Sequence, residues 1–336
     1  MRIIGFFNNK GGVGKTSLVY HVAWMLSDLN HRVIAVDLDP QANLTSMFLS
    51  EERLEQIWDD KNRNITIHDA VSPQFRGTGD IQSPHIEKIN NLSYPLFPDS
   101  IGLLVGDLEL SRIEDTLSDA WPRCQNSEER AFRVMSAFAR TIAAAGEAHR
   151  AEIALVDVGP NLGALNRAAL LACDYVVVPL GADLFSLQGL RNMGPTMRGW
   201  RGTWDEAKSK NPNKNLVLPE GKMQPIGYVV MRFSTSESRP ARAYAKWITR
   251  MPQQYREFIL DEQNAAESDP ESDPNRLATL KDYRSLMPLA QEARKPMFLL
   301  RPADGAFGGH QRAVTGCYAD FERLTRKILE KTGFPQ

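Results

Sequence analysis

A glycine-rich segment near the start of the chain carries the residue types that bind nucleotide phosphates. Residues 8–16 read NNKGGVGKT and follow an apolar stretch at residues 3–7, which predicts a loop between a first strand and a helix. Glycines let consecutive backbone amides point at phosphate oxygens, and the positive end of the following helix favours the same anion. In this setting Lys15 would reach the β- and γ-phosphates and the Thr16 hydroxyl would ligate Mg²⁺. The segment therefore predicts a site for nucleotide phosphates and Mg²⁺.

Two further apolar runs end in carboxylates. Residues 33–36 (VIAV) precede Asp37 and Asp39, and residues 153–156 (IALV) precede Asp157. Runs that are apolar throughout are typical of parallel strands buried on both faces, and the carboxyl ends of such strands share the edge of the sheet where ligands bind. We therefore expect these aspartates beside the phosphates, with Asp157 holding Mg²⁺ through a coordinated water.

The segment KGGVGKT at residues 10–16 resembles the deviant Walker A motif of the ParA/MinD/Soj family of ATPases, in which an additional lysine precedes the glycines. The resemblance continues through VDLDPQANLT at residues 36–45, the family's switch I, and through residues 286–296. One departure is DVGP at residues 157–160, where the family usually has D-x-P-P. The resemblance implies an α/β P-loop NTPase fold with a mostly parallel twisted sheet flanked by helices on both faces. It also implies an ATPase that hydrolyses ATP to ADP and phosphate slowly without a partner, closest to short, Soj-like ParA proteins.

The same resemblance assigns roles to individual residues. Lys10 is expected to reach the ATP of the partner subunit in an ATP-dependent sandwich homodimer, and Asp39 to position the attacking water. Lys10, Lys15 and Asp39 are therefore the predicted catalytic residues, and Thr16, Asp39 and Asp157 the predicted metal ligands. The predicted nucleotide-binding residues are Lys10, Gly11, Gly12, Val13, Gly14, Lys15, Thr16, Ser17, Met231, Pro302 and Asp304.

Length and composition favour a single cytoplasmic domain. The chain has 336 residues, of which 42% are hydrophobic, so it can bury a large core. Its three cysteines are far apart, which argues against a disulfide framework and a zinc site. No apolar run approaches the roughly 20 residues of a membrane span, and the glycine-rich loop begins too close to Met1 for a signal peptide to precede it. We predict one domain over residues 1–336 with insertions near residues 50–100, 121–148 and 234–282.

The charges are distributed unevenly along the chain. Lys and Arg number 40 against 41 Asp and Glu, a formal net charge of −1. Residues 191–336 nevertheless hold 24 basic and 17 acidic residues, a balance of +7, and residues 1–190 a balance of −8. Such asymmetry is typical of a protein that contacts a polyanion with one face, although basic residues that merely solvate helices would give the same totals. By the resemblance, Arg198 is expected to contact DNA irrespective of sequence, and Arg239 and Arg242 lie where a second basic contact is expected.

Three classes of function compete for this sequence. A ParA-like ATPase would dimerise with ATP, bind DNA non-specifically and partition or position a DNA or protein cargo when a ParB-like or other adaptor stimulates hydrolysis, in the cytoplasm and on the nucleoid. A MinD-like ATPase would act on a membrane or a protein partner, but residues 331–336 (KTGFPQ) offer too little apolar area for a membrane anchor. An electron carrier similar to the nitrogenase iron protein would need bridging cysteines soon after residue 157, and none of the three cysteines follows that residue closely enough. We favour the first class, expect no membrane partner, and leave the cargo open.

Overall fold

The computed structural model describes residues 1–59, 64–90, 99–233, 245–266, 269–283 and 285–334. Its centre is an eight-stranded sheet in the order β3-β4-β2-β5-β1-β6-β7-β8. Neighbouring strands of this sheet are parallel except β3, which pairs antiparallel with β4. The mostly parallel sheet predicted from the apolar runs is confirmed. The strands are β1 (Arg2–Phe6), β2 (Val33–Asp37), β3 (Glu87–Ile89), β4 (Ile101–Leu104), β5 (Ile153–Asp157), β6 (Tyr175–Gly181), β7 (Gln224–Phe233) and β8 (Arg276–Lys281).

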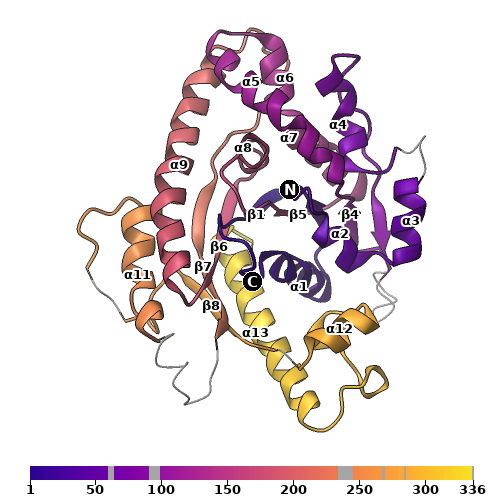
Figure 1. Cartoon of the computed structure of the whole chain (residues 1–336), viewed down its shortest axis with the longest axis vertical. Helices are drawn as coiled ribbons and strands as arrows, with labels where there is room; N and C mark the ends of the chain where they lie inside the picture. The colour runs from indigo at the N-terminus through magenta and orange to yellow at the C-terminus, as the bar shows by residue number, and fades with distance from the viewer. Residues whose placement is uncertain (60–63, 91–98, 234–244, 267–268, 284, 335–336) are drawn as a thin grey trace.

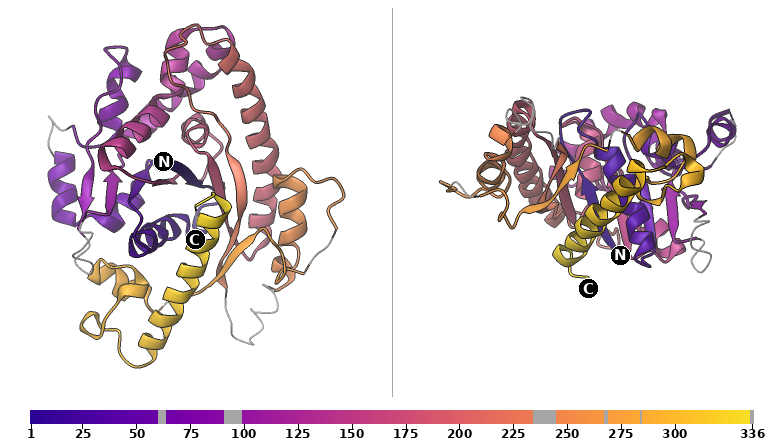
Figure 2. Two further views of the ribbon diagram at one scale, coloured as in Figure 1. Left: turned by 180° about the vertical axis from the view of Figure 1, so that it is seen from behind. Right: turned by 90° about the horizontal axis from the view of Figure 1, so that it is seen from below.

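Helices cover both faces of the sheet (Figure 1). Because successive side chains of a strand point to opposite faces, Ala154 and Val156 of β5 join one core with α4–α9, while Ile153 and Leu155 join a second core with α1, α12 and α13. The views in Figure 2 show α13 lying along the face that α1 covers. The helices are α1 (Lys15–Asp28), α2 (Asn43–Phe48), α3 (Glu51–Asp59), α4 (Ile67–Arg76), η1 (Leu108–Ile113), α5 (Glu114–Gln125), α6 (Glu129–Met135), α7 (Ala137–His149), α8 (Ala164–Leu171), α9 (Leu184–Ser209), α11 (Met251–Gln254), the π-helical η2 (Tyr255–Ile259), α12 (Met287–Ala293), η3 (Met297–Leu299), η4 (Pro302–Asp304) and α13 (Gly309–Lys331).

The segment between β4 and β5 contains α5, α6 and α7. The predicted insertion at residues 121–148 falls within these helices. Parts of the insertions predicted near residues 50–100 and 234–282 lie outside the described residues. Within the described part of the chain, no helix combines the length and the apolar composition that a membrane crossing requires.

The strand order brings the chemically active segments to one edge of the sheet. Strand β5 lies between β1 and β2, with Asp157 in register with Phe6 on one side and with Asp37 on the other. The loops that follow the carboxyl ends of β1, β2, β5 and β6 therefore lie next to one another at the same edge of the sheet. The glycine-rich loop, the two aspartate-containing segments and the start of α9 are brought together in this way.

Candidate nucleotide site

The glycine-rich loop adopts a backbone that its glycines make possible. Gly12 and Gly14 have φ values of +72° and +88°, in the left-handed region that other residues rarely adopt. Helix α1 starts directly afterwards at Lys15, so its free amides and positive dipole end face the loop. Lys15 is buried, with 7% of its surface exposed. The loop thus lies between β1 and the N-terminus of α1, and the binding of phosphates by the loop and Lys15 stays a prediction.

Two asparagines in front of the glycines tie the loop to β6 and α9. The Asn8 side-chain amide donates to the Pro179 carbonyl at 2.6 Å, and its Oδ1 accepts the Lys10 amide at 2.9 Å. A Cβ added to Gly189 of α9 would lie 2.6 Å from Asn9 Oδ1, so a larger residue at this position would displace the Asn9 side chain. Sequence analysis did not predict these roles of Asn8 and Asn9. The feature that could have indicated them is the pair of polar residues directly after the apolar first strand.

Lys10 forms an ion pair within its own subunit. Its Nζ lies 2.5 Å from Asp183 Oδ2, and the two side chains are 32% and 35% exposed. Asp183 also caps α9 by accepting the Ser186 amide at 2.9 Å. Burial acts to raise the pKa of Asp183, but the hydrogen bonds from Lys10 and Ser186 lower it overall. Beside this pair, Leu184 and Phe185 are 53% and 71% exposed, and Lys10 Nζ lies 5.8 Å from the Phe185 ring centroid. Sequence analysis did not identify Asp183 as part of the site.

Asp157 presents a fully buried carboxylate at the end of β5. Within the described part of the chain neither of its oxygens has a partner at hydrogen-bond geometry, although the Thr16 hydroxyl is close enough to lower its pKa. Burial raises the pKa of Asp157 to about 6, against the opposing effect of Lys15. A divalent cation with oxygen ligands would satisfy such a carboxylate. Thr16, Asp157 and the neighbouring Asp39 therefore fit Mg²⁺ in the chemistry of their donor atoms.

Asp37 has a structural role in switch I. Its carboxylate accepts the Thr45 amide at 2.8 Å and the Asp39 amide at 3.3 Å, which fixes the first turn of α2. A Cβ on Gly106 would lie 2.8 Å from Asp37 Cγ, so the loop after β4 closes tightly over this carboxylate. Burial and the negative charge of Asp157 raise the pKa of Asp37 to about 8. Asp37 thus holds the backbone that carries Asp39.

Asp39 lies where switch I meets residues 158–163, the segment after β5 that corresponds to switch II. Its Oδ1 accepts the Gln41 amide at 3.0 Å and would lie 3.6 Å from a Cβ built on Gly159. The Asn166 side-chain amide in turn donates to the carbonyls of Gly159 and Asn161 at 2.8 and 2.7 Å. The predicted water-positioning carboxylate is therefore held against the segment that follows β5. Its catalytic role stays a prediction.

Two cavities adjoin the glycine-rich loop. The larger, of about 580 Å³, is lined by residues that include Lys10, Gly12, Val13, Asp183 and Met231. A smaller one, of about 70 Å³, is lined by residues that include Gly14, Ser17 and Met231. The structure thus brings Met231, far away in sequence, to the same site as the loop.

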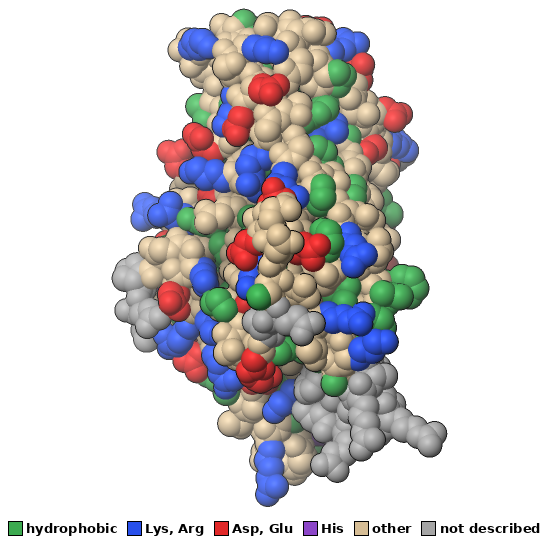
Figure 3. All heavy atoms as spheres, turned by 90° about the vertical axis from the view of Figure 1, so that its left-hand side faces the viewer, with side chains coloured by type: hydrophobic (Ala, Val, Ile, Leu, Met, Phe, Trp, Pro, Cys, Tyr) green, Lys and Arg blue, Asp and Glu red, His purple; other side chains and the backbone are tan. Residues whose placement is uncertain are grey.

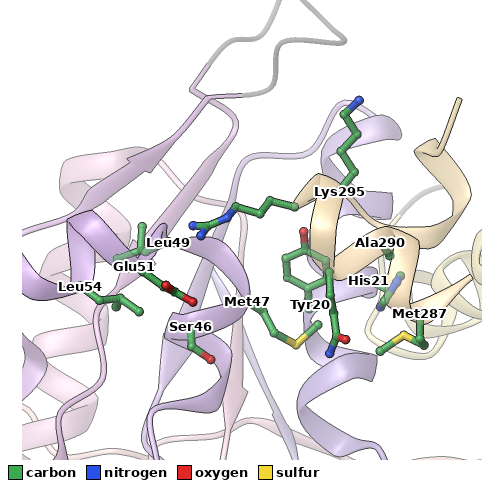
Figure 4. Close-up of a pocket in the computed structure, with 12 residues that line it drawn as sticks. Tyr20, His21, Ser46, Met47, Leu49, Glu51, Leu54, Met287, Ala290 and Lys295 are labelled. Carbon is green, nitrogen blue, oxygen red and sulfur yellow. The ribbon is translucent and has the colours of Figure 1, made fainter. Parts of the chain in front are cut away.

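A third cavity, of about 320 Å³, lies between α1, α2 and α12 (Figure 4). Lys295 on its rim is paired with Asp304 of η4 at 2.7 Å, and Pro302 starts the same short helix. Pro302 and Asp304 therefore lie near this third cavity and do not line either cavity at the loop. Their contact with adenine stays a prediction.

His21 links α1 to the segment after α12. The imidazole is fully buried, and burial lowers its pKa to about 4, so the ring is neutral at neutral pH. Its Nδ1 lies 2.6 Å from the Ser17 carbonyl and its Nε2 lies 3.1 Å from the Met297 amide. These distances identify Nδ1 as the protonated nitrogen and Nε2 as the acceptor. A neutral histidine thus ties the helix that starts at the phosphate loop to the carboxyl-terminal part of the fold.

Of the three arginines predicted to contact DNA, the structure describes Arg198. Arg198 on α9 donates from Nη1 to the Phe258 carbonyl at 2.6 Å, and its Nη2 lies 2.9 Å from Asp261. Its side chain is 29% exposed, so the guanidinium is largely engaged in holding the end of η2. Arg239 and Arg242 lie outside the described residues.

Other basic residues are exposed close to α11. Figure 3 shows Lys and Arg side chains along this side of the molecule, with acidic groups among them. Lys246 and Arg250 are exposed and flank the Trp247 ring, with their charged groups 5.0 and 5.8 Å from its centroid. The charges of Lys246 and Arg250 are therefore more accessible to a ligand than the charge of Arg198, which is bonded to Phe258 and Asp261.

Comparison with known proteins places the chain in a family. A family model described as an AAA domain matches residues 1–207, more than half of the chain. The chain belongs to the ParA/Soj family of ATPases. Among the relatives of this ParA-family ATPase is the chromosome partitioning protein ParA of Caulobacter vibrioides, which is 27% identical over 207 residues, 60% of this chain and 64% of the relative.

Solved structures support the P-loop fold of this ParA-family chain. A protein of Corynebacterium diphtheriae is 24% identical, with 98% of both chains covered and a TM-score of 0.67. The ATP complex of Cyanothece McdA is 15% identical, with 100% of this chain and 98% of that chain covered and a TM-score of 0.59. At these identities the likeness concerns the fold alone.

Proposed function

We propose that the chain is a partition or positioning ATPase that binds ATP with Mg²⁺ and closes into a sandwich homodimer. The observation that carries this proposal is the position of Lys10, a second lysine at the rim of the cavity over the phosphate loop. Exposed Leu184 and Phe185 follow Asp183 at the start of α9, with the Phe185 ring centroid 5.8 Å from Lys10 Nζ, and large exposed apolar side chains favour a surface that another protein covers. A second copy of the chain would bury these side chains and receive Lys10.

The geometry divides the work of ATP hydrolysis among a few residues. The loop amides and Lys15 bind and orient the phosphates, and Thr16 and Asp157 would hold Mg²⁺, which neutralises the phosphate charge that develops during transfer. Asp39 orients the attacking water against the backbone of switch II. The protein by itself hydrolyses ATP slowly, because stabilisation of the rest of the transition-state charge depends on a partner protein. A ParB-like or other adaptor would accelerate it, and the cargo can be DNA or protein.

Two substitutions separate dimerisation from hydrolysis. Lys10→Ala should leave ATP bound to a monomer, because Lys10 contributes to the phosphates of the other subunit. Asp39→Ala should give an ATP-bound dimer that hydrolyses poorly, because a carboxylate that orients water acts mainly in the transition state. Light scattering with ATP and Mg²⁺, together with phosphate release, measures both effects. Lys210→Ala is the surface control. A monomeric Asp39→Ala variant beside a dimeric Lys10→Ala variant would reverse the roles that we assign.

We further propose that the ATP-bound dimer binds DNA without sequence preference and is therefore nucleoid-associated in the cytoplasm. The +7 balance of residues 191–336 and the exposed charges of Lys246 and Arg250 support this proposal. Binding through phosphates should weaken steeply with salt, since each neutralised phosphate releases counterions. Arg239 and Arg242, which lie outside the described residues, stay predicted DNA contacts.

The DNA surface can be tested by charge reversal. Lys246→Glu and Arg250→Glu should each weaken ATP-dependent binding to arbitrary duplexes in mobility shifts and reduce the salt dependence by about one phosphate contact. Arg326→Glu on α13 is the matched control. For Arg198, the comparison is between Arg198→Glu and Asp261→Asn, which breaks the same ion pair but keeps the positive charge. If both changes weaken binding equally, Arg198 acts through the fold of η2 and not by contacting phosphates.

A further inference from the structure

Helix α8 receives its N-terminal cap from a distant helix. Its N-cap residue, Gly163, has no side chain, but Glu114 at the start of α5 accepts the amides of Ala164 and Leu165 with its two carboxylate oxygens, at 2.6 and 2.7 Å. The first amides of a helix have no partner within the helix, and a negative charge there is further stabilised by the helix dipole. Glu114 thus satisfies two amides that would otherwise be buried without acceptors.

The sequence around α8 leaves room for this carboxylate. A Cβ on Gly163 would lie 2.6 Å from Glu114 Oε1, so any larger residue would collide with the cap. One turn into α8, the guanidinium of Arg167 lies 4.4 Å from the ring centroid of Trp121 on α5. Burial lowers the pKa of Arg167 to about 10, while the charge of Glu114 raises it. Helices α5 and α8 are therefore joined by a cap and by a stacked cation.

The capped end of α8 is also the end of switch II. Residues 158–163 run directly from Asp157 into α8, and Asn166 in its first turn donates to the carbonyls of Gly159 and Asn161. A Cβ built on Gly159 would lie 3.6 Å from Asp39 Oδ1, so switch II passes beside this carboxylate. Glu114 is thus linked, through the start of α8, to the backbone beside the carboxylate that we assign to the attacking water.

We propose that Glu114 is a positioning residue for ATP hydrolysis, which fixes switch II through the N-terminus of α8. This inference rests on the proposed ATPase function and adds a residue that lies outside the phosphate and metal positions. Without the carboxylate, the Ala164 and Leu165 amides lose their acceptors, so the first turn of α8 opens and Gly159 is no longer held beside Asp39. We expect ATP binding to be largely unaffected, because the two hydrogen bonds of Glu114 described above go to the start of α8 and not to the phosphate loop.

The test compares Glu114→Ala and Glu114→Gln with Asp115→Ala, an exposed acidic neighbour in the same helical turn. For Glu114→Ala we expect the ATP affinity to stay within about twofold and kcat to fall at least about tenfold, because small displacements in a reactive geometry cost that much. Glu114→Gln keeps one acceptor and should lie between Glu114→Ala and the wild type. Hydrogen exchange should become faster at Ala164 and Leu165 in both variants and remain unchanged in Asp115→Ala.

Two results would overturn the positioning role of Glu114. An unchanged kcat in both Glu114 variants, with or without faster exchange, would overturn the positioning role. A parallel loss of ATP affinity would overturn it as well, since it would show general damage to the site. If Glu114→Ala does not fold, the comparison of Glu114→Gln with the wild type decides. Absence of Mg²⁺-dependent hydrolysis in the wild type itself would instead refute the proposed function, a result distinguishable from a defect confined to the Glu114 variants.

Discussion

Lys15→Ala is expected to lose at least about a hundredfold in ATP affinity. Lys15 is buried at the N-terminus of α1, where its charge faces the phosphate cradle and opposes the negative charge of Asp157. Removing one member of a buried charge pair typically costs about 3 kcal/mol or more, which corresponds to that factor. Titration calorimetry with ATP and Mg²⁺ measures the affinity directly.

Two controls make the result specific to the cradle. Lys15→Gln keeps much of the side-chain length without the charge and should lose affinity to a similar extent. Lys331→Ala changes an exposed lysine at the end of α13 and should bind ATP like the wild type. Normal affinity in Lys15→Ala would show that the loop is not the phosphate site, and the proposed function would fail with it.

Asp157→Asn should change stability in opposite directions with and without ligand. The pKa of Asp157 is raised from 3.8 to about 6 by burial, so between these pH values the folded protein keeps a proton that the unfolded chain has lost. Stability therefore falls as pH rises through this range, and above about pH 6 the charged carboxylate costs the native state about 3 kcal/mol. Asparagine carries no charge, so the nucleotide-free variant should be more stable at pH 7.5 by up to that amount.

Ligand should reverse this order. ATP with Mg²⁺ stabilises the wild type by binding the folded state, and part of that gain depends on the Asp157 carboxylate. Urea unfolding with a chelator, and again with ATP and Mg²⁺, measures both effects, with Asp115→Asn as the exposed control. At pH 4 the advantage of the ligand-free variant should nearly vanish, because Asp157 is then protonated in the folded protein. Lower stability of the ligand-free variant at pH 7.5 would contradict the destabilising effect of the buried charge. An undiminished gain with ATP and Mg²⁺ would contradict the assignment of Asp157 to the metal.

The sequence by itself determined the α/β fold and the position of the phosphate loop. Apolar runs that end in Asp37 and Asp157 favour buried parallel strands, because a strand covered on both faces accommodates consecutive apolar residues. Lys10 to Thr16 require a strand on one side and a helix on the other. These signals are local, so a single sequence contains them, and the family match over residues 1–207 agrees with them.

The tertiary structure alone decided which distant groups engage the predicted residues. The partner of Lys10 is Asp183, 173 positions away, and the cap of α8 comes from Glu114, 50 positions before Ala164. Arg198, whose contact with DNA stays a prediction, donates to the carbonyl of Phe258, 60 positions away. No local pattern identifies such pairs, because a charged or polar side chain in a sequence shows its bonding capacity but not its partner. The partner is set by the strand order and by the close approach of helices to the site, which depend on the packing of the whole chain.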